Sequence, residues 1–315
     1  MSESIKNRSE LLFLYDVKYA NPNGDPMDAN RPRMDEDSMK CLVTDVRLKR
    51  TIRDFIDNKF NGENKNGNEI FIKEIIKDDG NTASVKDRIK EVSKKSGKKN
   101  LIELKNFILE NFIDTRMFGA TYPVELTKGN KDSITLTGPI QFNIGSSLHK
   151  VKEVPFDLSL VMASGEGKKT GSQAEGGKKT IKYGLIGFHG IVNEVAAKHT
   201  NLTTGDIDHL LNGMWFGTKE LLTTSKKGHM PRLLVKIDYQ PGYYIGDLLE
   251  LLTIKTENGI EEELIEDVTN YTLITDELNE ILKKHEDKII SVSVKKDDRL
   301  KLSAPIFKSQ ELNLS

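Results

Sequence analysis

The sequence contains a single cysteine, Cys41, among its 315 residues. One thiol excludes a disulfide framework and any zinc site built from several cysteines. No stretch approaches the ~18 consecutive apolar residues that a membrane-spanning helix needs, and the opening MSESIKNRSE lacks the apolar core of a signal peptide. These absences predict a cytoplasmic protein with no membrane partner. The chain is long enough to bury one large core or two smaller ones.

An excess of charge of either sign is also missing, because 47 basic side chains face 48 acidic ones and leave a net charge of -1. The two signs are nevertheless separated along the chain. Residues 1–242 carry 38 basic and 32 acidic groups, whereas residues 243–315 carry 9 and 16. Phosphate binding depends on where cations lie and not on their sum. The composition therefore permits a nucleic-acid partner for the first three-quarters of the chain.

Hydrophobic periodicity predicts an α+β fold. Residues 11–19 favour a strand, a loop rich in Pro, Gly and Asn follows, and Thr44 is a suitable N-cap for a helix over residues 44–58. Further strands are expected at residues 69–75, 133–143, 156–162, 180–191, 232–239 and 289–294, and further helices within 76–112 and at 205–215 and 275–286. This order fits a βαββαβ, ferredoxin-like domain with a large insert and a lysine-rich hairpin.

The helix predicted over residues 44–58 has one apolar arc and one basic face. The apolar arc is formed by Leu48, Ile52, Phe55 and Ile56, and the basic face by Arg47, Lys49, Arg50 and Arg53. Two interpretations fit: a solvated face neutralised by nearby aspartates, or a surface that contacts phosphates. Because Lys49 and Arg53 lie off the apolar arc, we expect folding to survive replacement of both by alanine.

Residues 163–179 form a low-complexity tract with five glycines and four lysines in 17 residues. The tract does not match the phosphate-binding loop G-x-x-x-x-G-K-[ST], because Lys168 and Lys178 are each followed by another lysine. The strand-like runs on both sides predict the tip of a long hairpin. The tract is either a disordered surface loop or a tip that contacts phosphates, since glycines let lysines follow a charged strand.

Catalytic motifs are scarce, and no cofactor is predicted. The aspartates of the first loop resemble a cation site in composition only, because turn chemistry explains most of them. These aspartates are Asp25, Asp28, Asp35 and Asp37. The six histidines show no H-x-x-x-H or H-E-x-x-H spacing. His149 and His229, each beside a lysine in a predicted loop, are candidates for a general acid in RNA cleavage or for phosphate contact.

Eight short motifs, taken together, resemble a known family. They are YANPNGDP (19–26), RPR (31–33), TDVRLKRTIR (44–53), MFGA (117–120), LTGPIQF (136–142), IKYG (181–184), FHG (188–190) and SKKGHMPR (225–232). In this order and spacing, the sequence is similar to the repeating crRNA-backbone subunit of type I CRISPR surveillance complexes (Cascade), in its type I-B branch. The resemblance spans about residues 10–240.

The resemblance implies a hand-shaped protein. By order along the chain, its parts are an RRM-like palm (residues 1–60 and 113–245), an inserted fingers subdomain (60–112, with 130 as its outer limit), a thumb β-hairpin (150–182) and an acidic C-terminal segment (246–315) that completes the palm or contacts a neighbouring subunit. Copies of such a subunit stack along crRNA as a helical filament. Each thumb kinks the strand and leaves short runs of guide bases free to pair with target DNA.

The resemblance also implies a non-catalytic scaffold with no cofactor and no metal. The implied partners are crRNA, target DNA through the guide, further copies of the same chain, and the other Cascade subunits. Those subunits are the large subunit, the crRNA 5′-end-capping subunit and the crRNA-processing endonuclease. DNA cleavage belongs to a recruited helicase-nuclease. The protein itself should therefore read only the backbone and the shape of its RNA.

By motif position, the resemblance implies crRNA contacts at Thr44, Arg47, Lys49 and Arg53, and Arg50 lies on the same basic face. Related subunits have a Gln before the L-K-R element, where this sequence has Val46. In the thumb, the candidate wedge is Met162 and the candidate clamps are Lys168, Lys169, Lys178 and Lys179. By charge and loop position, the remaining candidates are Lys226, Lys227 and His229.

Two catalytic alternatives stay open within the same superfamily. Related backbone subunits of type III complexes cleave target RNA with a metal-dependent aspartate in the loop after the first strand. The corresponding region here, residues 25–37, holds the four aspartates named above. A crRNA-processing endonuclease would instead use His149 or His229 without a metal. Neither activity has a matching motif in this sequence.

Overall fold

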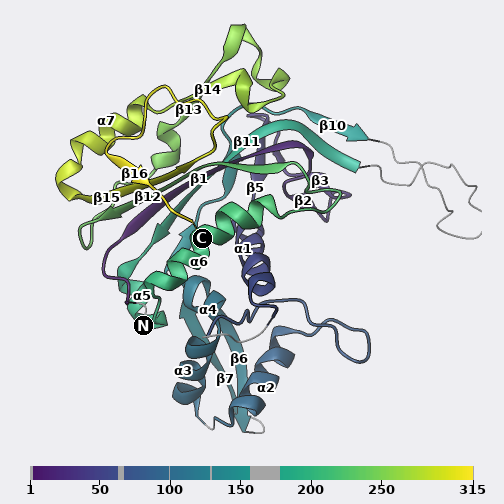
Figure 1. The fold of residues 1–315 in the computed structure, drawn as a ribbon. Coiled ribbons are helices and arrows are strands. Elements are labelled where there is room, and N and C mark those ends of the chain that lie inside the picture. Colours follow the sequence, from purple (N-terminus) through teal and green to yellow (C-terminus); the bar gives the residue numbers. More distant parts are fainter. Residues whose placement is uncertain (1–2, 63–66, 99, 128–129, 157–177, 315) are drawn as a thin grey trace, which may run out of the picture.

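The computed structural model describes residues 3–62, 67–98, 100–127, 130–156 and 178–314. Ten strands form its central sheet: β1 (Ser9–Ala20), β4 (Met34–Asp35), β5 (Lys40–Val43), β8 (Ile140–Phe142), β9 (Gly145–Ser147), β10 (Glu153–Phe156), β11 (Lys178–Val192), β12 (His229–Tyr239), β15 (Ile289–Lys296) and β16 (Ser309–Glu311). The main path runs in the order β16-β15-β12-β1-β11-β9-β5-β4, and β8 and β10 also pair with β11 (Figure 1). Only the pair β15–β16 is parallel, so the sheet is mixed.

The central strand is β1, which extends the strand predicted over residues 11–19. It lies antiparallel between β11 and β12, with Phe13 opposite both Phe188 and Leu234. Because successive side chains point to opposite faces, Phe13 enters one core while Leu12 and Leu14 enter the other. A strand that is buried on both faces needs the near-continuous apolar run seen in the sequence.

Two helices, α1 (Asp45–Lys59) and α6 (Thr204–Lys219), cover one face of the sheet, and the short helix α5 (Glu194–Thr200) precedes α6 (Figure 1). The chain passes through β1, α1, β8 and β9, β11, α6 and β12 in turn. The central unit therefore follows a β-α-β-β-α-β path. The two helices approach closely because α6 has Gly213 at the contact, where a Cβ atom would lie 3.0 Å from Cγ2 of Ile52.

The acidic C-terminal segment adds β15 and β16 to the edge of the sheet, and the rest of the segment covers the opposite face of the sheet (Figure 1). It contains β13 (Thr253–Thr256), β14 (Tyr271–Ile274), α7 (Asp276–Lys284) and several 3-10 turns. Its apolar side chains, among them Leu248, Leu273 and Leu278, join a second core with Leu12 and Leu14 of β1. The segment is therefore an integral layer of the fold, with its acidic groups on the outer side.

The residues between α1 and β8 form a separate layer, below the sheet in Figure 1. Its elements are α2 (Val85–Ser96), α3 (Leu101–Asn111), α4 (Ile113–Phe118), β6 (Gly119–Thr127) and β7 (Asn130–Thr137). β6 and β7 pair as an antiparallel hairpin. The layer has its own hydrophobic core, in which Phe71 contacts the rings of Phe112 and Tyr122. This insert is largely helical, as predicted for residues 76–112.

The strand expected at residues 69–75 does not form. Only isolated bridges, from Glu69 to Phe112 and from Ile76 to Thr82, are present in this part of the described chain. The carboxylate of Asp114 accepts hydrogen bonds from the backbone N–H groups of Phe71 (2.8 Å) and Ile72 (3.1 Å). The Asp114 carboxylate thus satisfies backbone N–H groups that a neighbouring strand would satisfy in a sheet. A tertiary contact therefore overrides the strand propensity of this apolar run.

The strand expected at residues 133–143 is divided at Gly138. β7 belongs to the insert, whereas β8 pairs with β11 in the main sheet. A Cβ atom on Gly138 would lie 2.0 Å from the carbonyl carbon of Phe118, so only glycine fits this crossing between the two layers. The lysine-rich hairpin begins as β10 and returns as β11, with Phe156 opposite Lys178. Its tip, residues 157–177, lies outside the described residues.

Within the described ranges, no helix combines the length and the apolarity needed to cross a bilayer.

Ile52→Ala is expected to destabilise the protein by about 2–5 kcal/mol, because Ile52 is fully buried between α1 and α6 and its loss leaves a cavity. Urea denaturation followed by circular dichroism measures the change. The matched control is Val46→Ala on the exposed side of α1, which should alter the free energy of unfolding by less than about 0.5 kcal/mol. Equal effects of the two substitutions would contradict the packing of α1 described here.

Candidate nucleic-acid interface

The amino end of α1 is fixed by the loop that follows β1. Oδ1 of Asn23 accepts hydrogen bonds from the backbone N–H (3.0 Å) and the hydroxyl (2.9 Å) of Thr44. The Thr44 hydroxyl oxygen in turn accepts a bond from the N–H of Arg47 (3.4 Å), which confirms the predicted N-cap. A small ribbon of β2 (Gly24–Asp25) and β3 (Arg31–Pro32) stiffens this loop. Loop and helix start therefore form one unit.

Two cations of α1 point into the protein, which corrects the expectation of a single exposed basic face. Lys49 is only 8% exposed, and its Nζ donates to Asp45 (2.9 Å) and to Gln141 of β8 (3.1 Å). Arg53 donates to the buried carboxylate of Asp114 (2.9 Å) and lies over the ring of Phe118, 5.0 Å from its centroid. The insert covers this side of α1, which a helical wheel drawn for one helix does not show.

Arg47 and Arg50 differ in their surroundings. Arg50 is exposed and pairs with Asp54 one turn away (2.6 Å). Arg47 is half-buried, and its guanidinium donates to the Thr51 hydroxyl (3.0 Å) without a salt bridge to any residue that the structure describes. Burial lowers the pKa of Arg47. Of the four cations of the predicted basic face, Arg47 is therefore the one that is partly buried and forms no salt bridge with a described residue.

Lys226 lies near Arg47, in the loop that leads into β12. Its Nζ donates to the backbone carbonyls of Asn21 (2.6 Å) and Pro22 (2.8 Å), which ties this loop to the end of β1. Burial, followed by repulsion from Arg47, lowers the pKa of Lys226 to about 8. No described carboxylate forms a salt bridge with Lys226. Arg47 and Lys226 are thus two neighbouring positive charges, neither of which forms a salt bridge with a described carboxylate, as expected of an anion-binding site.

Both histidine candidates are buried: His149 lies in a loop, as predicted, whereas His229 is the first residue of β12. His149 is fully buried, with Nδ1 bonded to the Lys150 carbonyl (2.7 Å) and Nε2 accepting from the N–H of Leu185 (3.2 Å). Burial lowers its pKa. His229 begins β12, stacks on Tyr15 and bonds the Lys226 carbonyl through Nδ1. Burial and the nearby Lys226 lower its pKa to about 3, so its imidazole is neutral at pH 7 and carries no charge for phosphate contact.

The remaining candidate cations lie at the root of the hairpin and in the loop before β12. Lys227 is exposed. Lys178 and Lys179 open β11, and the Nζ of Lys178 donates to the Thr224 carbonyl, which joins hairpin and loop. The other thumb candidates, Met162, Lys168 and Lys169, lie outside the described residues. The structure thus brings Arg47, Lys226, Lys227 and Lys178 to one end of the sheet.

The aspartates of the first loop are dispersed into local contacts. Asp25 pairs with Arg33 (2.9 Å), and Asp28 lies 3.8 Å from Arg31. The Ser38 hydroxyl donates to Asp35 (2.6 Å) and lowers the pKa of that carboxyl. Among the described residues, no three His, Cys, Asp or Glu side chains come together in a way that could hold a metal ion.

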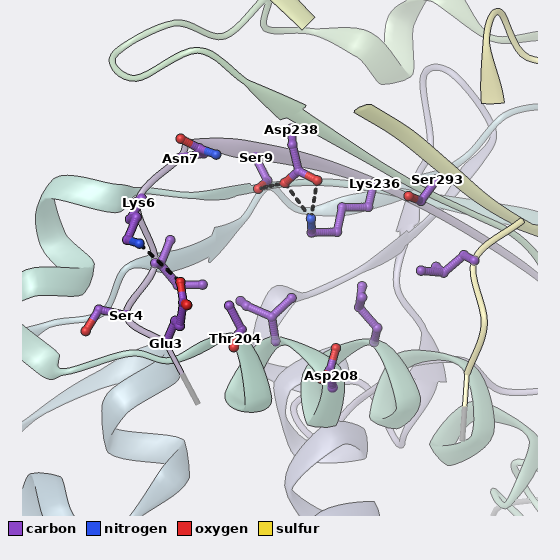
Figure 2. A pocket seen from close by; sticks show the side chains of 14 residues that line it. Glu3, Ser4, Lys6, Asn7, Ser9, Thr204, Asp208, Lys236, Asp238 and Ser293 are labelled. Atoms are coloured by element: carbon purple, nitrogen blue, oxygen red, sulfur yellow. Dashed lines mark hydrogen bonds and ion pairs between the residues drawn. The ribbon is translucent and has the colours of Figure 1, made fainter. Parts of the chain in front are cut away.

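A cavity of about 400 Å³ lies at the other end of β1, between the first residues of the chain, α6 and β12 (Figure 2). Its polar groups bond one another: Asp238 accepts from the Ser9 hydroxyl (2.6 Å) and pairs with Lys236. Because β1 runs from Ser9 to Ala20, the full length of the central strand separates this cavity from the Arg47–Lys226 pair. The cavity is therefore not part of the cationic surface.

Comparison with known proteins gives matches along most of the chain. The family described as CRISPR-associated protein Cas7 matches residues 7–276. A protein of Haloferax volcanii, also described as CRISPR-associated protein Cas7, is 33% identical over 312 residues, which cover 94% of this chain and 88% of that protein. A solved structure described as a CRISPR RNA-guided surveillance complex, pre-nicking, matches with a TM-score of 0.55, and one described as a CRISPR RNA-guided surveillance complex with 0.54.

Each of the two structural matches is 11% identical and covers 97% of this chain, with 96% and 95% of the other chain. The fold is therefore that of protein chains found in CRISPR RNA-guided surveillance complexes. The sequence matches go further: the chain belongs to the Cas7 family of CRISPR-associated proteins. This confirms the family resemblance found in the sequence.

Sequence reasoning missed the partners that decide which cations are free. Asp114 neutralises Arg53 from 61 residues away along the chain. Gln141 accepts a hydrogen bond from Lys49, which lies 92 residues away. No local pattern signals such pairs. The sequence indicates that Asn23 is a turn residue. Its hydrogen bonds to Thr44 depend on the path of the loop, which the sequence does not show.

Arg53→Ala is expected to destabilise the protein by about 3–5 kcal/mol, because it leaves the buried carboxylate of Asp114 without its cation. This reverses the expectation that Arg53 is dispensable for folding. The matched control is Arg50→Ala, three residues earlier on the same helix, where loss of an exposed pair should cost about 0–1 kcal/mol. Urea denaturation measures both values, and equal stability of the two variants would refute the structural role of Arg53.

Proposed function

We propose that this chain is a non-catalytic RNA-binding scaffold that polymerises along crRNA as the backbone of a type I-B CRISPR surveillance complex. In this role it holds the guide bases exposed for pairing with target DNA. The observation that carries the proposal is the Arg47–Lys226 pair, two half-buried cations without a described carboxylate partner. Membership of the Cas7 family and the likeness to chains of RNA-guided surveillance complexes support it.

A scaffold that carries any guide must bind RNA independently of base sequence. Phosphates allow such binding, because they are the same at every nucleotide and are attracted to cations held in a partly desolvated site. Lys226 is positioned by two backbone carbonyls, so its ammonium is held in place without being neutralised by a carboxylate. Its third N–H remains available for a phosphate oxygen. Specificity for a target then resides in the guide bases.

We assign the parts of the hand as follows. The palm comprises residues 1–60 and 113–245, the fingers residues 60–112 and the thumb residues 150–182. The separate core around Phe71 supports a distinct fingers unit, although β6 and β7 share that core and extend it to Thr137. Antiparallel pairing of β10 with β11 supports the thumb. Segment 246–315 completes the palm by covering its second face.

Within this frame the proposed crRNA contacts fall into two groups. The accessible group comprises Arg47, Arg50, Lys178, Lys179, Lys226 and Lys227, with Thr44 at the start of α1. Lys49 and Arg53 would contact RNA only while also bonded to the protein side chains that now accept their hydrogen bonds. Neutral His229 would help to position Lys226 through its hydrogen bond to the Lys226 carbonyl. The thumb candidates Met162, Lys168 and Lys169 complete the proposal. Further copies of the chain and the other Cascade subunits are the proposed protein partners.

Arg47→Ala combined with Lys227→Ala is expected to weaken binding of an unrelated single-stranded RNA and to lower the slope of log K against log salt by up to about 1.4, since each lost phosphate contact on a single strand removes about 0.7 of a unit. Fluorescence anisotropy at several salt concentrations measures both quantities. The matched control removes two exposed lysines of α7, Lys283→Ala with Lys284→Ala, and should leave affinity and slope near those of the wild type.

An immeasurably weak affinity of the wild-type protein at low salt would refute the scaffold. The control variant losing as much affinity as the test variant would move the binding surface elsewhere. Cleavage of the RNA with Mg²⁺ or Mn²⁺ that disappears in Asp35→Ala, with binding retained, would favour a metal-dependent ribonuclease instead.

RNA affinity is expected to fall between about pH 7 and pH 9.5, with a midpoint near the pKa of about 8 of Lys226, because phosphate binds the protonated amine. In the absence of RNA, the free energy of unfolding changes in the opposite direction. The unfolded state keeps this proton up to about pH 10.4, whereas the folded state loses it near pH 8, so this group raises the free energy of unfolding as the pH rises through 8. Lys226→Arg keeps the charge at all these pH values and should abolish the fall in affinity. An unchanged pH profile in Lys226→Arg would exclude Lys226 from the interface.

A further inference from the structure

The C-terminal layer carries a compact run of carboxylates near the root of the hairpin β10–β11. Residues 261–267 have the sequence EEELIED, with five carboxylates in seven positions, and we call this stretch the acidic turn. Ile265 anchors it in the second core. The side-chain oxygen of Asn270 accepts hydrogen bonds from the backbone N–H groups of Glu266 and Asp267 (3.0 Å each). The fold therefore fixes the position of these carboxylates.

The acidic turn contacts lysines of the two central strands. Glu266 pairs with Lys182 of β11 (2.8 Å), whose ammonium also donates to the Leu264 carbonyl (3.4 Å). Asp267 lies 4.0 Å from the ammonium of Lys18 in β1. The hydrogen bond and the charge of Lys182 lower the pKa of Glu266, so this carboxylate is ionised at pH 7. Both lysines thus have an anionic partner within the chain.

These paired lysines border the cations of the candidate RNA surface. Lys182 lies four residues after Lys178 on β11. The backbone N–H of Lys18 donates to the Gly228 carbonyl (3.1 Å), at the end of the loop that holds Lys226. Neither Lys178 nor Lys226 forms a salt bridge with a described residue; their ammonium groups bond backbone carbonyls instead. The acidic turn therefore marks the boundary between lysines with and without a described carboxylate partner.

Stability of the fold does not account for so many carboxylates at one place. The side chain of Glu266 is 57% exposed and that of Lys18 46% exposed, and exposed ion pairs contribute little because water and salt screen them. Glu261 and Glu263 form no salt bridge with a described residue, and their charges repel those of their neighbours. The negative potential of the acidic turn is better explained by its effect on a charged ligand.

We propose that the acidic turn is an internal competitor of phosphate, which neutralises Lys18 and Lys182 and keeps the RNA backbone off this side of the hairpin root. The proposal rests on the proposed function, because the excluded ligand is the strand bound at Arg47 and Lys226. Carboxylates and phosphates compete for the same ammonium groups. Exposed carboxylates also repel a phosphate within a Debye length, about 8 Å at physiological salt. The RNA is thereby confined to the side of the sheet that carries α1.

Docking of a basic protein surface explains the acidic turn less well, because most of its carboxylates already bond groups of the same chain. Besides Glu266, Glu262 accepts a hydrogen bond from the backbone N–H of Lys150 (2.9 Å), and Asp267 pairs with Arg299 (2.7 Å). A basic partner would have to displace these contacts, whereas an internal competitor consists of them. Contact with a second copy of the chain is the competing outcome of the test.

The test uses the full-length protein and an unrelated single-stranded RNA labelled with fluorescein. Glu266→Gln with Asp267→Asn removes two charges at constant size, and the asparagine oxygen can accept the N–H of Thr269 as Asp267 does (3.1 Å). RNA affinity should rise, and the slope of log K against log salt should steepen by up to about 1.4, since each freed lysine adds about 0.7 of a unit. The gain is then up to about 7-fold larger at 50 mM than at 200 mM salt. Fluorescence anisotropy measures both quantities.

Matched variants separate local competition from overall charge. Glu277→Gln with Glu280→Gln on α7 removes the same charge where no described cation forms a salt bridge, and should leave the slope unchanged. Lys18→Met with Lys182→Met should change RNA binding little in the otherwise wild-type chain, because both ammonium groups are neutralised there. The same pair of substitutions should cancel the gain when the acidic turn is neutralised. If the double variant of the turn does not fold, Glu266→Gln alone should give about half the change in slope.

Four outcomes would contradict the inference. Wild-type affinity and slope after neutralisation of the acidic turn, or an equal gain in the α7 control, would overturn the competitor and leave the scaffold intact. A large loss of affinity on replacing Lys18 and Lys182 in the otherwise wild-type chain would show that these lysines contact RNA. Loss of self-association in light scattering, with RNA affinity unchanged, would assign the acidic turn to a second copy. Absence of RNA binding by every variant would instead refute the proposed function, and this inference with it.

Discussion

Burial of β1 on both faces and along both edges is the constraint on which the rest of the structure depends. The strand pairs with β11 and β12, carries α1 and α6 on one side, and supports the C-terminal segment on the other. Just after the strand ends, the carbonyls of Asn21 and Pro22 accept hydrogen bonds from Lys226. The next residue, Asn23, bonds to the residue that caps α1. The candidate RNA surface is therefore built on the end of the most constrained element, which limits its motion.

The cations of α1 have two different roles, one structural and one in the candidate binding site. The position of the nearest carboxylates decides which role each cation has. Arg53 joins the insert to the helix through the buried Asp114, whose other bonds hold the backbone of Phe71 and Ile72. Arg47, six residues earlier, forms no salt bridge with a described carboxylate and lies near Lys226. A buried cation with its carboxylate is a structural link, whereas a partly buried cation without one is a site for an external anion.

The edge that carries Arg47, Lys178 and Lys226 has the features that the proposed contact with an RNA strand of any sequence requires. Backbone carbonyls position Lys226, and a hydrogen bond positions Lys178. None of these groups is arranged to recognise the edge of a particular base. Such an edge suits a protein whose specificity is delegated to the bases of a guide. The cavity near Ser9 lies elsewhere.

The sequence by itself determined the elements whose signal is local: β1 through its apolar run, the start of α1 through Thr44, and the family through its motifs. Tertiary structure alone decided the rest. Residues 70 and 71 enter two different cores in place of a strand, Lys49 and Arg53 are covered by the insert, and His149 and His229 are buried. The physical reason is the same in each case. Burial and pairing depend on partners tens of residues away, and periodicity along one segment carries no information about them.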